Sequence, residues 1–185
     1  MKASLSGGLL LFAGLTGSCD AGSDSEEPYR IERDHFGPLT PQTAYDPDTV
    51  QRLFPGATVE ATRSRLSDVV NGWSEAIAVG LSDGGSITVS GSSGRVFSAS
   101  SDSPQFVGER NLRVGLSWQT AGFDASSCTP RQTGLSSKTK MVQCSEAIPN
   151  IFYVFTVPEF DISNEKPQFE NAVLTEIAWQ DPVED

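Results

Sequence analysis

The 185-residue sequence has one histidine, three cysteines and two methionines, and it has no apolar run long enough to cross a bilayer as a helix. These shortages exclude a histidine-rich metal site, a small scaffold held by many disulfides and a membrane-spanning helix. Basic residues are also scarce, since 13 Lys and Arg stand against 24 Asp and Glu, for a formal net charge of -11. Nucleic acid is therefore a poor candidate partner, because sequence-independent attraction to phosphate needs positive charge.

The N-terminal residues are organised as an export signal. A Lys follows the initiator Met, and residues 5–15 form a short apolar stretch that suits the core of a signal peptide. It ends in Leu-Thr-Gly-Ser-Cys at 15–19, which resembles the bacterial lipoprotein cleavage box, where small residues precede a lipidated Cys. We therefore predict a signal peptide over 1–18 and lipidation of Cys19. Such boxes usually carry Leu where this chain has Thr16, so cleavage by the general signal peptidase, without lipid, is the alternative.

After the cleavage site, residues 19–34 are predicted to be the lipidated Cys and an acidic, flexible tether, because small and acidic side chains have little to bury. A calcium site is not expected there, since no Asp-x-Asp-x-Asp-Gly loop is present. Acyl chains on Cys19 would attach the protein permanently to a membrane. The sequence leaves the choice between the inner and the outer membrane open.

The two later cysteines, Cys128 and Cys144, predict a disulfide. If Cys19 carries lipid, they form an even pair in a compartment where disulfides persist. Closing a loop of 16 residues, from position 128 to position 144, would stabilise the fold by ~3 kcal/mol in the chain-entropy model. A reactive thiol or a metal-binding pair is the alternative, but Cys-x-x-Cys spacing and a nearby second His are missing.

The remaining composition, 37% hydrophobic and 20% charged, is that of a globular protein with one domain. We predict a single β-rich domain over 35–181 and an acidic tail over 182–185. Asp46 should cap a short helix that has Pro47 at its first position, and Ser117 should cap a second one. Strands are expected at 58–63, 73–79, 86–90, 95–100, 151–157 and 173–179, with a further hairpin between Cys128 and Cys144.

Three of these segments carry more specific expectations. The first four strands should form a meander whose first turn is Asn71-Gly72, a pair typical of type I′ turns. Residues 151–157 are apolar on both faces, which is typical of a central buried strand. Residues 173–179 alternate so that Val173, Thr175, Ile177 and Trp179 should share a face. About eight short strands with one or two short helices predict an antiparallel β-sandwich or half-closed barrel.

Several short motifs follow one another in a recognisable order between residues 36 and 180. They are Gly37-Pro38-Leu39-Thr40, Leu53-Phe54-Pro55-Gly56, Asn71-Gly72, Val114-Gly115-Leu116-Ser117-Trp118, the Cys128 and Cys144 pair, Tyr153-Val154-Phe155 and Ile177-Ala178-Trp179. With the export signal, this set resembles the YfeY-like envelope lipoproteins, known as domain of unknown function 1131. The resemblance implies an extracytoplasmic β-rich domain, Cys19 as the lipid site, and Cys128 and Cys144 as the family's two later cysteines. The family has no agreed catalytic residues, so the resemblance implies none here.

Two motifs match catalytic patterns without the required context. Residues 80–84 fit the G-x-S-x-G nucleophile elbow around Ser82, but a strand rather than a helix follows, and the only histidine, His35, lies upstream instead of downstream. Residues 137–140 fit S-x-x-K, but the companion Lys-Thr-Gly and Ser-Asp-Asn motifs are missing. We interpret both as polar turns and predict no catalytic residue, no metal site and no cofactor.

Other polar and aromatic residues favour structural roles. His35 could act as an acid, a base or a pH sensor, but a surface or packing role is favoured. Glu159 and Asp161 would share a face of a strand, as acid–base pairs can, but the adjacent Pro158 indicates a loop. The tryptophans could line a groove, although core positions are favoured: Trp73, Trp118 and Trp179.

We therefore expect a membrane-anchored lipoprotein of the bacterial cell envelope, exposed to the periplasm and acting as a non-enzymatic binding or structural module. Its partner is expected to be another envelope component. The alternatives are a small periplasmic hydrolase and an inhibitor of a secreted basic hydrolase, which an acidic domain would attract electrostatically. The sequence identifies neither the ligand nor the oligomeric state.

Overall fold

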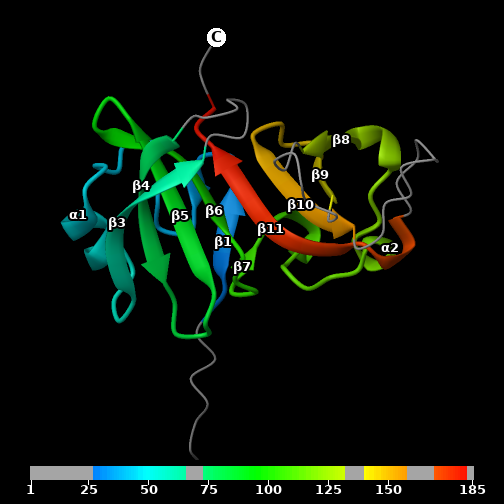
Figure 1. Cartoon of the computed structure of the whole chain (residues 1–185), viewed down its shortest axis with the longest axis horizontal. Coiled ribbons are helices and arrows are strands. Elements are labelled where there is room, and N and C mark those ends of the chain that lie inside the picture. Colours follow the sequence, from blue (N-terminus) through cyan, green and yellow to red (C-terminus); the bar gives the residue numbers. More distant parts are fainter. Residues whose placement is uncertain (1–26, 66–72, 132–139, 158–168, 183–185) are drawn as a thin grey trace, which may run out of the picture.

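A computed structural model describes residues 27–65, 73–131, 140–157 and 169–182. Its main feature is an antiparallel sheet of eight strands in the order β3-β4-β5-β6-β11-β10-β9-β8 (Figure 1). The strands are β3 (Thr58–Arg65), β4 (Trp73–Gly80), β5 (Ser86–Ser92), β6 (Arg95–Ser101), β8 (Cys128–Arg131), β9 (Lys140–Ser145), β10 (Ile151–Val157) and β11 (Val173–Gln180). The last strand along the chain, β11, thus joins the early meander to the later hairpin.

A second, three-stranded sheet has the order β2-β1-β7, with β1 (Tyr29–Glu32) antiparallel to β2 (His35–Phe36) and parallel to β7 (Phe106–Val107). Buried side chains from both sheets form one hydrophobic core, so the molecule is a sandwich. The predicted tether over 19–34 is wrong at its C-terminal end, because Tyr29–Glu32 form strand β1. Ile31 is the one buried residue of β1, and charged residues flank it on both sides. A single buried position is too short an alternation to be recognised as a strand from the sequence.

The helices are short and begin where the sequence predicts. α1 (Pro47–Leu53) starts with Asp46, whose carboxylate accepts a hydrogen bond from the Thr49 amide, and α2 (Trp118–Ala121) starts with Ser117. The described residues also contain two single 3-10 turns, η2 (Ala125–Ser127) and η3 (Phe169–Asn171), and a tight turn with positive φ, η1 (Glu109–Asn111). Within the described part of the chain, none of these helices has the length or the apolar run needed to span a bilayer. The prediction of a mainly antiparallel β fold with one or two short helices is confirmed.

The predicted four-strand meander is also confirmed, since β3, β4, β5 and β6 pair in sequence order. The turn between β5 and β6 consists of Ser93 and Gly94, both with positive φ, as a two-residue hairpin turn that matches the sheet twist requires. The turn expected at 71–72 lies outside the described residues.

Strand β10 is almost completely buried, as expected, but the predicted face of β11 is wrong. Val154 pairs with Glu176 and Phe155 pairs with Leu174, so Thr175 is an extra residue that forms a bulge. The bulge shifts the alternation by one position. Leu174, Ile177 and Trp179 are therefore buried, whereas Val173 is 38% exposed.

Candidate functional site

The two later cysteines form the predicted disulfide. Cys128 on β8 and Cys144 on β9 stand directly opposite each other in the sheet register, with an S–S distance of 2.08 Å. Cys144 is completely buried, while Cys128 is partly exposed and packs against the core. The predicted lipid site, Cys19, lies outside the described residues, as do Glu159 and Asp161.

A tight turn places Arg110 in an unusual backbone conformation. Arg110 and Asn111 have φ of 52° and 60°, and the Leu112 amide donates to the Glu109 carbonyl at 2.9 Å, which together make a type I′ turn. Positive φ costs a residue with a Cβ atom about 1–2 kcal/mol. The sequence carried no signal for this turn, because Arg-Asn lacks the glycine that usually marks it.

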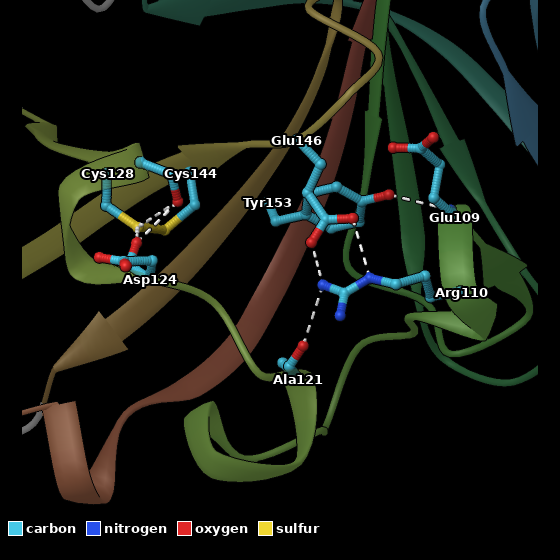
Figure 2. Close-up of polar contacts among 9 residues, drawn as sticks. Glu109, Arg110, Ala121, Asp124, Cys128, Cys144, Glu146 and Tyr153 are labelled. Carbon is cyan, nitrogen blue, oxygen red and sulfur yellow. Dashed lines mark hydrogen bonds and ion pairs between the residues drawn. A yellow bond between two sulfur atoms is a disulfide. The ribbon is translucent and has the colours of Figure 1, made fainter.

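The side chain of Arg110 connects three separate segments (Figure 2). Its guanidinium forms an ion pair with Glu146 in the loop between β9 and β10, and Nε donates to Glu146 Oε2 at 2.9 Å. Nη2 also donates to the carbonyl of Ala121 at the end of α2, at 3.1 Å. The group lies 5.5 Å from the centre of the Phe123 ring. These contacts compensate the positive charge and join η1, α2 and the β9–β10 loop.

Tyr153 lies beneath this turn, on the buried strand β10. Its hydroxyl accepts a hydrogen bond from the Glu109 amide at 2.9 Å, and burial raises the pKa of Tyr153 to about 12. A Cβ atom on Gly108 would lie 2.5 Å from this hydroxyl, so a glycine is required there. At neutral pH the phenol therefore keeps its proton, and the Tyr153 hydroxyl serves as an acceptor in the core.

Glu109 contributes one unusual atom to this site. Its Oε2 is buried and has no hydrogen-bond partner among the residues that the structure describes. The other carboxylate of the cluster, on Glu146, is occupied by Arg110. The arrangement is a structural junction in which an ion pair and a buried phenol hold three segments together.

The residues of the G-x-S-x-G motif form a hairpin turn rather than an elbow. The Leu81 amide donates to the Gly85 carbonyl at 2.9 Å, and strand β5 follows directly. Ser82 is exposed in this turn, and Asp83 accepts hydrogen bonds from the Gly85 amide and the Ser103 hydroxyl. The interpretation of the motif as a polar turn is confirmed. The S-x-x-K motif lies mostly outside the described residues.

His35 lies on β2, where Nδ1 is 2.9 Å from a carboxylate oxygen of Asp34, and this contact lowers the pKa of Asp34. Ligand atoms of Glu32, Asp34 and His35 all lie within 4.8 Å of one another, so this group could hold a metal ion. The group was not predicted, although the sequence Glu-Arg-Asp-His at 32–35 contains all three side chains. Both carboxylate residues are exposed, and nothing further in the described part points to a ligand.

The side chains of Trp179 and Trp118 both pack against the hydrophobic core. Trp179 is buried, and its Nε1 donates to the Arg33 carbonyl at 3.0 Å. Trp118 is partly buried and stacks on Phe169, with ring centroids 4.2 Å apart. The predicted core role is confirmed for Trp179, whereas Trp118 covers the edge of the core. The side chain of Trp73 lies outside the described residues.

No protein-family model matches this chain, and no curated protein matches it. A solved structure that is similar is the crystal structure of the uncharacterized protein YfeY from Escherichia coli. The TM-score is 0.61 with 13% sequence identity, over 82% of this chain and 99% of the YfeY chain. At this identity the likeness concerns the fold, and it agrees with the fold expected from the order of the sequence motifs. The chain therefore has a YfeY-like fold.

Proposed function

We propose that the chain is a lipoprotein of the bacterial cell envelope, a member of the YfeY-like lipoproteins, whose β domain acts as a non-enzymatic binding or structural module facing the periplasm. The observation that carries the proposal is the Cys128–Cys144 disulfide inside a YfeY-like fold. Disulfides persist in oxidising compartments and are rare in the cytosol. An export signal ending in Cys19 accounts for both the compartment and the third cysteine.

The anchoring part of the proposal is tested by expressing the full chain in a bacterial host fed with an alkyne-labelled palmitate. We expect label in the protein, a mature N-terminal peptide that begins at Cys19, and recovery in the membrane fraction. The matched control, Cys19→Ser, should lose the label and the membrane association. An unlabelled, soluble chain beginning at Cys19 would show processing by the general signal peptidase, and an intact Met1 would show that the chain is not exported.

The binding part of the proposal is tested by crosslinking in the intact envelope, followed by mass-spectrometric identification of the captured species. A specific envelope protein captured by the parent, and competed by added purified domain, would support a binding module. Capture of only bulk lipid and the most abundant membrane proteins would contradict it. Density-gradient separation of the two membranes in the same sample shows which one carries the protein.

A further inference from the structure

Strand β8 is attached to the sheet by two links on opposite faces. It has four residues, lies at the edge of the large sheet and, among the described strands, pairs only with β9. At its start, the Cys128–Cys144 disulfide lies on the core side. At its end, three residues later, Arg131 faces the other side, because side chains alternate along a strand. Arg131 Nη1 lies 3.0 Å from Glu176 Oε2 on β11, so this ion pair reaches over β9 and β10.

Apart from the disulfide, few interactions among the described residues hold β8. Its ladder to β9 has only four register pairs, and the Cα–Cα distance of 4.1 Å between Cys128 and Cys144 is typical of a non-hydrogen-bonded pair. Pro130, two residues after Cys128, is at the same kind of position, so its nitrogen points to the open edge and not to β9. Thr129 and Pro130 are exposed, so the strand buries little apolar surface. The Arg131 and Glu176 side chains are 28% and 25% exposed, so the pair is partly buried, and the desolvation of both charges offsets part of their attraction. Among the described residues, the disulfide is therefore the strongest link between β8 and the rest of the sheet.

We propose that the Cys128–Cys144 disulfide is a redox-operated latch: reduction by a dithiol releases β8 from β9 while the rest of the sheet stays folded. The rest is held by other interactions, since the core residues of β10 and β11 are completely or almost completely buried and the meander packs with α1 and the small sheet. Release makes β9 the new edge strand, with unpaired backbone groups and no proline. The state of the disulfide thus determines which strand forms this edge of the sheet: β8, which contains a proline, or β9, whose backbone groups can pair with another strand.

The difference in exposure between the two cysteines determines which sulfur the reductant attacks. A thiolate of the reductant reaches the partly exposed Cys128 and attacks its sulfur, the S–S bond breaks, and Cys144 leaves with the electron pair and takes up a proton. The second thiol of the reductant then attacks the mixed disulfide. Cys128 is released as a thiol and the reductant becomes a disulfide. Two electrons and two protons pass from the dithiol to the protein.

The experiment is hydrogen exchange with mass spectrometry on the full chain carrying Cys19→Ser, with and without dithiothreitol. Loss of ~3 kcal/mol of loop-closure stabilisation corresponds to faster exchange by a factor on the order of 100. We expect this increase in Cys128–Arg131 and Lys140–Ser145, with unchanged protection in β4–β6, β10 and β11. Alkylation of the reduced sample, followed by peptide mapping, confirms that both thiols have been freed.

Two variants distinguish the disulfide from the ion pair as the link that holds β8 in place. The double variant Cys128→Ser, Cys144→Ser should show the open pattern without reductant and should not respond to dithiothreitol. Arg131→Gln, which removes the other link, should change exchange much less while the disulfide is intact. Unchanged protection of β8 after complete reduction would overturn the proposal, and so would a uniform increase across the sheet, since the disulfide would then support the whole fold.

Discussion

Raising the pH above 10 is expected to destabilise the fold through Tyr153. The unfolded chain loses this phenolic proton near pH 10, whereas burial raises the pKa of Tyr153 in the fold to about 12. The contribution is therefore complete below pH 10 and is lost as the pH rises through 12. Each unit of difference corresponds to about 1.4 kcal/mol, so the free energy of unfolding should fall by roughly 2–3 kcal/mol over this interval.

The assay is urea unfolding followed by tryptophan fluorescence at a series of pH values, together with phenolate absorbance of the native protein. Tyr153→Phe should be less stable at neutral pH by about 1–3 kcal/mol, because the partly buried Glu109 amide loses its acceptor. In this variant the free energy of unfolding should also fall less steeply above pH 10 than in the parent.

Tyr45→Phe is the matched control, since burial also raises the pKa of this partly exposed tyrosine and its removal leaves the Tyr153 site intact. Because Tyr153 is the more deeply buried of the two, the free energy of unfolding of Tyr45→Phe should still fall steeply above pH 10. If Tyr153→Phe and Tyr45→Phe lose stability in parallel between about pH 10 and pH 12, the phenol in the core does not dominate the loss, and the reasoning is refuted.

Three further substitutions test the packing around this site. Gly108→Ala should destabilise the fold by about 1–3 kcal/mol in urea unfolding, because the new Cβ meets the Tyr153 hydroxyl, and a neutral effect would show that the turn shifts freely. Trp179→Phe should cost about 2–3 kcal/mol in the same measurement, because it removes the hydrogen bond to the Arg33 carbonyl and leaves a cavity, and a loss below about 1 kcal/mol would contradict this. Glu146→Gln should lower the free energy of unfolding by no more than about 1 kcal/mol, because Arg110 is half exposed and water screens the ion pair. The loss should be smaller at high salt, and a salt-independent loss of several kcal/mol would contradict this screening.

The sequence was sufficient to predict those features of the fold that depend on residues close together along the chain. The Asp46 cap with the following Pro47 starts α1, and alternation within residues 58–100 predicts the meander, because caps, turns and side-chain alternation are local. The bulge at Thr175 was missed, since it depends on how β10 and β11 pair. The strand at Tyr29–Glu32 was missed because it is stabilised by β7, which lies more than seventy residues later in the chain.

At the candidate site, too, some features were predicted from the sequence and others were found only in the structure. Counting cysteines predicted the Cys128–Cys144 bond once Cys19 was assigned to the export signal, because the two remaining cysteines have one possible pairing. Only the tertiary structure showed that Arg110 reaches Glu146, that Gly108 makes room for Tyr153, and that Arg131 reaches Glu176 over two strands. These contacts join residues at least 36 positions apart, so chain folding and not local pattern brings them together. The sequence by itself thus determined the strands, caps and cysteine pair, and the packing of distant segments decided which side chains meet.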